Sequence, residues 1–210
     1  MSQKSLRRYT DITALSYLLS NESITLLNPR TWDDRNDSYF LALYKKKKKL
    51  ASVLALCFAQ AAETYHHWKV FAPGPAGVCV HFRQEELLEA LRAHQGLRSD
   101  FVNYRTIDNL AGNQPAIRDL PFVKRIAFKD EMEFRIIYES KKEKLPKRDF
   151  PVPRSAIEKV TLSPWIYPDL ADSAKALLRS LSKWKDLQIS RSSLIDNEKW
   201  KKIADRATPI

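Results

Sequence analysis

Hydrophobic residues along the chain follow two spacings, one typical of strands and the other of helices. Near the N-terminus, residues 6–9 predict a short strand, and the apolar positions that follow recur at helical spacing. Thr10 or Asp11 would cap that helix, because both side chains accept hydrogen bonds from free backbone amides. Residues 23–27 predict a second strand, which ends before Pro29. The chain therefore opens as strand, helix, strand.

Further along the chain, predicted strands and predicted helices alternate irregularly. Strands are predicted at residues 53–58, 77–82, 101–104, 129–138, 157–162 and 187–194, helices at 39–49, 61–71, 84–94, 117–127 and 169–185, and loops at 31–38 and 109–115. This mixture favours an α+β fold over a parallel sheet. We expect one domain over residues 1–210, with a charged tail at 196–210 that Trp200 anchors.

The most distinctive polar pattern lies at residues 129–138, where two carboxylates lead into an apolar run. On a strand, successive side chains point to opposite faces, so Glu131, Glu133 and Arg135 would share one face. Met132 and Phe134 would then point toward the core. A row of two acids and a base is either a solvated, self-paired sheet surface or part of a site.

Charge narrows the kind of partner that the chain would attract. The formal net charge is +11 and the sequence pI is near 9.6, so polyanions such as nucleic acid, nucleotides or anionic membrane are favoured. A run of five lysines is either a solvated helix end or a phosphate-contacting surface: Lys45, Lys46, Lys47, Lys48 and Lys49. No apolar run is long enough for a membrane span, and residues 1–8 lack the apolar core of a signal peptide. We therefore expect a cytoplasmic protein that does not bind membranes.

Several classes of site are disfavoured by the residues present. With only 4 glycines, and without the glycine-rich phosphate-binding motifs, a glycine-cradled nucleotide site is not expected. The nucleophile elbow and the zinc-protease motif are also absent. Cys57 and Cys79 lie in apolar runs, which predicts buried, reduced thiols, and the four histidines show no zinc-site spacing. We expect no structural metal.

Three clusters of polar and aromatic residues remain as candidate chemistry. They surround Arg8, the aromatic pair Trp32 and Trp68, and the carboxylates Glu131 and Glu133. Together they offer a cation for an anionic group, flat rings for stacking, and paired carboxylates. That combination suits a dinucleotide that reacts at its glycosidic carbon.

The order of these motifs resembles a widespread bacterial and phage domain family of uncharacterised function. Over about residues 6–165 the motifs are Arg8-Tyr9-Thr10, Trp32-Asp33-Asp34-Arg35-Asn36-Asp37, Cys57-Phe58, Trp68-Lys69-Val70-Phe71, Gly77-Val78-Cys79-Val80-His81-Phe82 and Glu131-Met132-Glu133-Phe134-Arg135. This chain departs from the family where Asp33, Arg35 and Asp37 replace an Asn, a Pro and a Glu. It also has Phe71 where the family has a Tyr after the Trp.

The opening strand, helix and strand and the late Glu-x-Glu also resemble ADP-ribosyltransferase domains. That resemblance implies a single α+β domain with a mixed, mostly antiparallel split sheet, flanking helices, and NAD as substrate. The residues it would assign to NAD binding are Arg8, Tyr9, Thr10, Trp68, Phe71 and Arg135. Glu133 would hold the ribose, and Glu131 would orient or deprotonate the acceptor. Arg8 would pair with a pyrophosphate oxygen.

Three functions remain open from the sequence. The first is an ADP-ribosyltransferase acting on nucleic acid or protein, a toxin or phage-defence effector by analogy, with an antitoxin or regulatory protein as a possible partner. The second is a non-catalytic module that binds nucleic acid or a partner. The third, ranked last, is a metal-dependent nuclease that uses Asp33, Asp34 and Asp37, none of which has a clear spatial partner in the sequence.

Overall fold

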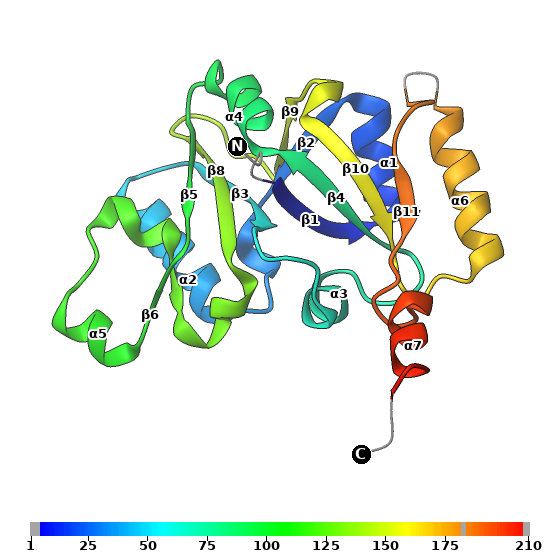
Figure 1. Ribbon diagram of the computed structural model, residues 1–210. Helices are drawn as coiled ribbons and strands as arrows, with labels where there is room; N and C mark the ends of the chain where they lie inside the picture. Colours follow the sequence, from blue (N-terminus) through cyan, green and yellow to red (C-terminus); the bar gives the residue numbers. More distant parts are fainter. Residues whose placement is uncertain (1–4, 182–183, 208–210) are drawn as a thin grey trace.

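The structure, a computed structural model, describes residues 5–181 and 184–207. Within these residues the fold is α+β and is built on a nine-stranded sheet (Figure 1). Its strands are β1 (Ser5–Asp11), β2 (Ser23–Leu27), β3 (Ser52–Ala59), β4 (Gly77–Arg83), β5 (Leu97–Phe101), β8 (Glu133–Ser140), β9 (Lys147–Pro151), β10 (Ile157–Leu162) and β11 (Ile189–Arg191). Two further strands, β6 (Asn103–Arg105) and β7 (Val123–Arg125), form a small parallel pair.

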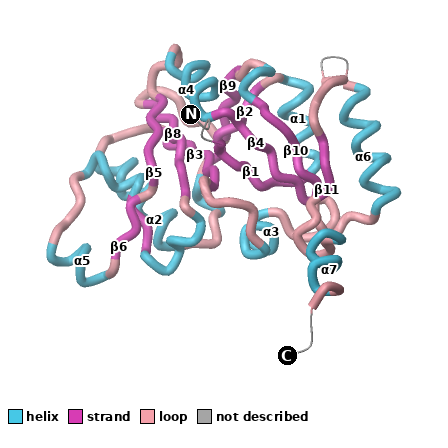
Figure 2. Tube along the Cα trace, viewed as in Figure 1, coloured by secondary structure: helices cyan, strands magenta, loops and turns pink. Residues whose placement is uncertain are grey.

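Helices surround this sheet on several sides. They are α1 (Ile12–Asn21), α2 (Arg35–Lys47), α3 (Tyr65–Phe71), α4 (Gln84–Arg92), α5 (Ile107–Gly112), α6 (Pro168–Ser180) and α7 (Glu198–Ala204), with short 3-10 turns η1 (Pro29–Thr31), η2 (Ile117–Phe122), η3 (Ile126–Glu131) and η4 (Arg154–Ala156). In Figure 2, α1 and α6 lie near the β4, β10 and β11 half, and α2 and α5 lie near the β3, β8 and β5 half. Among the described helices, none has both the length and the apolar character needed to cross a membrane.

Strand β3 is where the sheet divides. One of its edges pairs with β8 in antiparallel fashion over the full strand. The other edge meets β1 only where Ala59 lies opposite Arg7, and meets β2 only where Ala55 lies opposite Leu27. Between these two points the edge of β3 is left uncovered. The predicted mixed, mostly antiparallel split sheet is confirmed, with β10 and β11 as its parallel pair.

The continuous apolar run of β3 reflects burial on both of its faces. Leu54, Leu56 and Phe58 point into the main hydrophobic core, while Val53 and Ala55 point into a smaller core beneath α2. Successive strand residues alternate between faces, so an apolar residue is required at every position here. Strand β3, whose edge is open, is therefore held in place by packing on both of its faces.

Several predicted elements are confirmed closely. The strands at β1, β2 and β10 have the expected positions, and α1 begins after Asp11. The Asp11 carboxylate accepts hydrogen bonds from the backbone N–H groups of Thr13 at 2.8 Å and Ala14 at 2.9 Å. This is the capping expected from the sequence.

Other predicted elements differ from the structure for identifiable reasons. Helix α2 begins four positions before the predicted start, because the Asp34 side chain caps it. The predicted loop at 109–115 is partly helix α5, and Thr106 caps that helix. The predicted helix at 61–71 is helical only from Tyr65, after its cap Thr64. Local side-chain caps set these boundaries.

The largest error concerns residues 117–127, which were predicted to form one helix. They form η2, strand β7 and the start of η3 instead. Pro121 lies in the middle of this stretch and has no backbone N–H to donate, which favours a break in an α-helix. As a consequence, Lys124 lies on a strand.

One residue predicted to face the core, Met132, and one predicted to anchor the tail, Trp200, are both exposed. Strand β8 begins at Glu133 because Met132 adopts a left-handed backbone conformation with φ of 43°, and its side chain is 51% exposed rather than buried. Trp200 is 76% exposed and does not anchor the tail, whose helix α7 ends at Ala204. Positions 182–183 of the predicted helix at 169–185, positions 1–4 of the polar N-terminus, and positions 208–210 of the tail lie outside the described residues.

Candidate functional site

The open edge of β3 borders a cavity of about 390 Å³. Its lining comes from β1, β3, the segment around η1, the end of α3 and the stretch around η3: Arg7, Arg8, Tyr9, Leu27, Thr31, Trp32, Asp33, Asp34, Asp37, Ala55, Leu56, Cys57, Phe58, Ala59, Val70, Phe71, Lys124, Phe128, Glu131 and Glu133. Residues far apart in the sequence meet here because β1 separates from β3 beyond their single point of contact. The divided sheet thus creates the candidate site.

Five of the residues that the resemblance assigns to NAD binding or catalysis line this one cavity. They are Arg8, Tyr9, Phe71, Glu131 and Glu133. The cation, the rings and the two carboxylates therefore share a single space, which sequence order alone did not establish. This meeting is the main structural support for a site.

The carboxylate of Glu133 is held at the inner end of the cavity by Arg135. The Nε of Arg135 donates to Glu133 Oε1 at 2.6 Å, and its two terminal nitrogens donate to Asp37 at 2.8 and 2.6 Å. Arg135 also donates to the Pro121 carbonyl at 2.7 Å and is fully buried. Arg135 thus orients Glu133 and Asp37 from within the protein and does not line the cavity.

Lys124 connects the second carboxylate to the first. Its Nζ lies 2.5 Å from Glu131 Oε2, 3.3 Å from Glu133 Oε2 and 3.8 Å from Asp37 Oδ2. Glu131 is on η3 rather than on the strand, yet Lys124 brings its carboxylate beside that of Glu133. The expected row of charges is therefore a buried cluster, not a solvated sheet face.

This cluster contains three carboxylates and two cations, and it gives its two glutamates different acidities. Burial would raise the pKa of Glu133, but the charge and hydrogen bond of Arg135 outweigh it and lower that pKa to about 2. Burial raises the pKa of Glu131 to about 6 against the opposing charge of Lys124. Near neutral pH Glu133 is fully ionised, whereas Glu131 titrates within a unit or so of neutrality. Two glutamates with such different pKa values suit two roles, with Glu133 as a fixed anion and Glu131 as a proton acceptor.

Arg8 supplies the cation on the opposite strand. Its Nη1 donates to the Cys57 carbonyl at 3.2 Å, which ties β1 to the uncovered part of β3. Burial lowers the pKa of the Arg8 guanidinium, while the neighbouring Cys57 and Glu133 oppose that effect. An arginine starts from so high a pKa that the group stays charged. Arg8 is therefore a half-buried cation at the wall of the cavity.

Aromatic residues form the wall contributed by α3 and β1. Tyr9 stacks on His67 with ring centroids 5.4 Å apart and meets Trp68 edge-on at 5.2 Å. Trp68 is completely buried and donates its indole N–H to Glu63 at 2.7 Å, so it does not line the cavity. Phe71 does line it and is 39% exposed. Of Trp68 and Phe71, which the resemblance assigns to NAD binding, Phe71 is therefore the one that a ligand can contact.

Three other nominated groups lie outside the cavity lining or differ from expectation. Thr10 follows the lining residues on β1 but is not one of them. The lysines of the run 45–49 lie at the far end of α2 from Asp34, and a 13-residue helix is about 20 Å long. The thiols of Cys57 and Cys79 are free as expected, although Cys57 is only partly buried and lines the cavity.

The role of Lys124 in organising the carboxylates was not predicted from the sequence. Lys124 belongs to the stretch predicted as a helix, but it lies on β7 and its side chain points into the cluster. Trp32, nominated from the sequence as a stacking aromatic, lines the cavity, and its ring centroid lies 5.1 Å from the Arg135 guanidinium carbon. Pro121, which cannot continue a helix, is the signal that would have argued against a helix through Lys124.

Two of the three acids proposed for a nuclease, Asp34 and Asp37, are engaged in other contacts. Asp34 caps α2 through Oδ1, and Asp37 forms the two-pronged pair with Arg135. No group of three or more His, Cys, Asp or Glu side chains is arranged to hold a metal ion within the described parts of the chain. The geometry offers no support for metal-dependent cleavage at these residues.

Comparisons with known proteins identify no family. No protein-family model matches this chain, and no curated protein matches it, so the motif order described above stays a resemblance. Among solved structures, Thermus sp. 2.9 DarT in complex with ADP-ribosylated ssDNA is similar with a TM-score of 0.48 and 9% identity, over 91% of this chain and 95% of that one. The same protein in complex with NAD+ gives 0.45 and 10%, over 91% and 96%. At TM-scores below 0.5 such likeness identifies neither a family nor an activity, so function has to be sought in the site itself.

Proposed function

We propose that this protein binds NAD in the cavity between β1 and β3 and transfers the ADP-ribose group to a nucleic acid. The observation that carries the proposal is the meeting of Arg8 and Glu133 at one cavity, with Phe71 on its wall. Its volume of about 390 Å³ lies within the range of about 300–1,000 Å³ typical of small-molecule sites.

The ionised Glu133 suits the charge that develops in the reaction. When the bond between the ribose carbon and nicotinamide breaks, the electron pair goes to the ring nitrogen and neutral nicotinamide leaves. The ribose becomes oxocarbenium-like, and a fixed carboxylate beside it stabilises that positive charge. Arg135 and Lys124 hold Glu133 in one orientation, so the carboxylate need not reorganise.

Glu131 and Arg8 complete the proposed chemistry. An acceptor group that attacks the ribose carbon must lose a proton, and Glu131 can take it once ionised. The Arg8 guanidinium would pair with the pyrophosphate, and Phe71 would pack against the nicotinamide ring. Each group lines the cavity, so one bound NAD can reach them together.

The first test is transfer from labelled NAD. The protein is incubated with labelled NAD and with single-stranded DNA, RNA or cell lysate, and the products are digested with nuclease or with protease. The proposal predicts label that nuclease releases. Absence of label with every acceptor, together with absence of NAD binding, would reject it.

The rate of transfer is expected to depend on pH through Glu131. The burial that raises the pKa of Glu131 to about 6 leaves the base form scarce below that pH. A single-turnover rate should therefore rise about tenfold per pH unit up to about pH 6 and level off above it. The Glu131→Gln variant is expected to be slow and to lose this dependence. A wild-type rate that stays flat from pH 5 to pH 8 would exclude Glu131 as the proton acceptor.

A non-catalytic nucleic-acid-binding module remains the second candidate, because the net charge of +11 favours it independently of the cavity. Substitutions in the lysine run 45–49 test nucleic-acid binding separately from catalysis, because the run lies outside the cavity. Replacing Lys46, Lys47 and Lys48 by Gln should weaken single-strand binding. The slope of log affinity against log salt concentration should also flatten, by about 0.7 for each phosphate that the variant no longer binds. A salt slope identical to the wild type would show that the run does not bind phosphate.

A further inference from the structure

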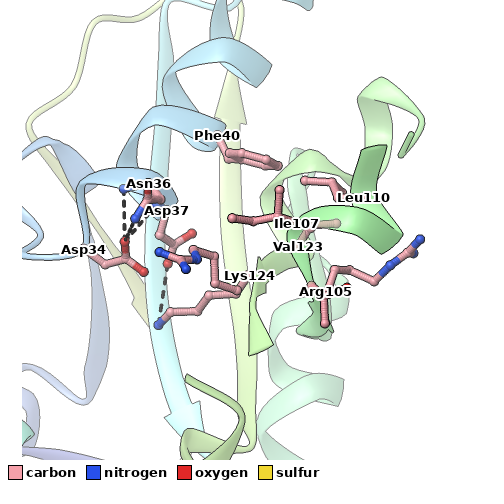
Figure 3. Close-up of a pocket in the computed structure, with 11 residues that line it drawn as sticks. Asp34, Asn36, Asp37, Phe40, Arg105, Ile107, Leu110, Val123 and Lys124 are labelled. Atoms are coloured by element: carbon pink, nitrogen blue, oxygen red, sulfur yellow. Dashed lines mark hydrogen bonds and ion pairs between the residues drawn. The ribbon is translucent and has the colours of Figure 1, made fainter. Parts of the chain in front are cut away.

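A second cavity, of about 210 Å³, adjoins the first. Asp34, Asp37 and Lys124 line both spaces, so the charged cluster separates them. Its other walls come from α2, from the β6–α5 segment and from β7 (Figure 3). A group bound there would lie next to the side chain that joins Glu131 and Glu133.

The second cavity has apolar walls that face each other. Figure 3 shows Phe40 of α2 directed toward Ile107 and Leu110, with Val123 beside them. Ile107 is 68% exposed, so part of this apolar surface is left to solvent. Facing apolar and aromatic side chains suit a flat ring, and stacking on them does not depend on the identity of that ring.

The two carboxylate oxygens of Asp34, at the rim of the second cavity, differ in their hydrogen bonding. Asp34 Oδ1 accepts the capping hydrogen bonds of α2 from the amides of Asn36 at 3.0 Å and Asp37 at 3.3 Å. Asp34 Oδ2 is buried and has no hydrogen-bond partner, so it lacks a donor. Such an atom is expected to be satisfied by a ligand N–H.

The two arginines at this cavity also differ. Arg105 is occupied by Asn109 and by the Asn113 carbonyl, and Figure 3 shows its side chain directed away from Lys124. Arg125 is exposed and makes no ion pair with any carboxylate of the described residues. It is therefore free to meet an anion at the mouth of the cavity.

We propose that the second cavity binds one unstacked base of a single-stranded nucleic acid, which is the acceptor; this rests on the proposed function. The base lies between Phe40 and Ile107, donates an N–H to Asp34 Oδ2, and its flanking phosphate meets Arg125. Single strands present bases without a cost of unpairing, and aromatic residues with nearby cations are the usual means of holding them. The charge of +11 favours this polyanion over a protein acceptor.

The first experiment measures binding and transfer separately. Ile107→Asn and Arg125→Gln are expected to weaken the binding of short fluorescent single strands, and to raise the acceptor KM, by about tenfold or more. The matched controls Leu177→Asn and Arg179→Gln make the same changes on the exposed side of α6, where Leu177 is 61% exposed. Equal losses in the variants and their controls, or no loss in either, would overturn the proposal.

The second experiment replaces one hydrogen-bond acceptor in the second cavity by a donor. Asn caps a helix as well as Asp does, so Asp34→Asn should keep α2 intact, with an unchanged melting temperature. It replaces the free acceptor Oδ2 by an amide donor, so the order of affinity among the four homopolymeric single strands should change. All four strands carry the same charge, so the lost negative charge of Asp34 affects them equally and leaves their order unchanged. An unchanged order would contradict base recognition by Asp34.

The outcomes also separate this inference from the proposed function. Fluorescence anisotropy of single strands requires no transfer. A protein that binds them through Ile107 and Arg125 but transfers nothing from NAD would reject the enzyme and leave the base site standing. Label on protein alone, without single-strand binding, would reject the base site and leave the enzyme standing.

Discussion

Replacing Glu133 by Gln is expected to lower the rate of ADP-ribose transfer by at least about 100-fold, the effect typical of removing one preorganised electrostatic group. The wild-type carboxylate is ionised because Arg135 lowers its pKa to about 2, despite its burial. Gln has the same shape but carries no charge, so it cannot stabilise a positive ribose. Single-turnover transfer of labelled ADP-ribose measures the change.

Two controls separate this loss from damage to the fold. Glu139 lies on the same strand and pairs with Arg98 at 3.2 Å outside the cavity lining, so Glu139→Gln makes the matched chemical change. It should transfer at the wild-type rate. Glu133→Gln should still bind NAD, because Arg8 and Phe71 are untouched. Equal activity in Glu133→Gln and the wild type would place the chemistry elsewhere.

Replacing Arg135 by Met is expected to lower the free energy of unfolding by about 3–5 kcal/mol, the usual cost of removing one partner from a buried ion pair. Arg135 is fully buried and is the hydrogen-bond donor to both Asp37 and Glu133. Without it, Lys124 would be the sole cation among three carboxylates of the cluster. Denaturant unfolding of the variant measures the loss.

A matched arginine and a double variant test the cause. Arg98→Met removes an arginine that is 36% exposed, and partly exposed pairs contribute about 0–1 kcal/mol. Combining Arg135→Met with Asp37→Asn should recover part of the stability, because it removes one of the buried carboxylate charges that Arg135→Met leaves unpaired. A loss below about 1 kcal/mol for Arg135→Met would show that the cluster relaxes or takes up protons freely.

Much of the fold follows from local patterns in the sequence. Apolar runs and caps indicated β1, α1, β2 and β10, because each is specified by residues close together in the chain. The stretch 117–127 was predicted wrongly by the same reasoning, since a helical apolar spacing competed there with Pro121. The divergence of β1 from β3 depends on pairing across the whole sheet, which local spacing does not encode.

The sequence predicts which residues belong to the candidate site better than it predicts how they are arranged. Glu133 and Arg135 were expected to share a strand face, and they do, but as a buried pair. The roles of Lys124 and Asp37 in the cluster were not predicted, because their partners lie on other elements. Residue type and spacing reveal candidate chemistry, whereas the partners that set a pKa come from tertiary packing.

Calorimetric titration of the wild-type protein with NAD tests most directly whether the cavity binds this dinucleotide. The cavity that Arg8, Phe71 and Glu133 line predicts saturable binding of one NAD per chain, and the Arg8→Ala variant should lose most of that affinity. If the wild-type protein shows no saturable binding of NAD, the cavity is not an NAD site.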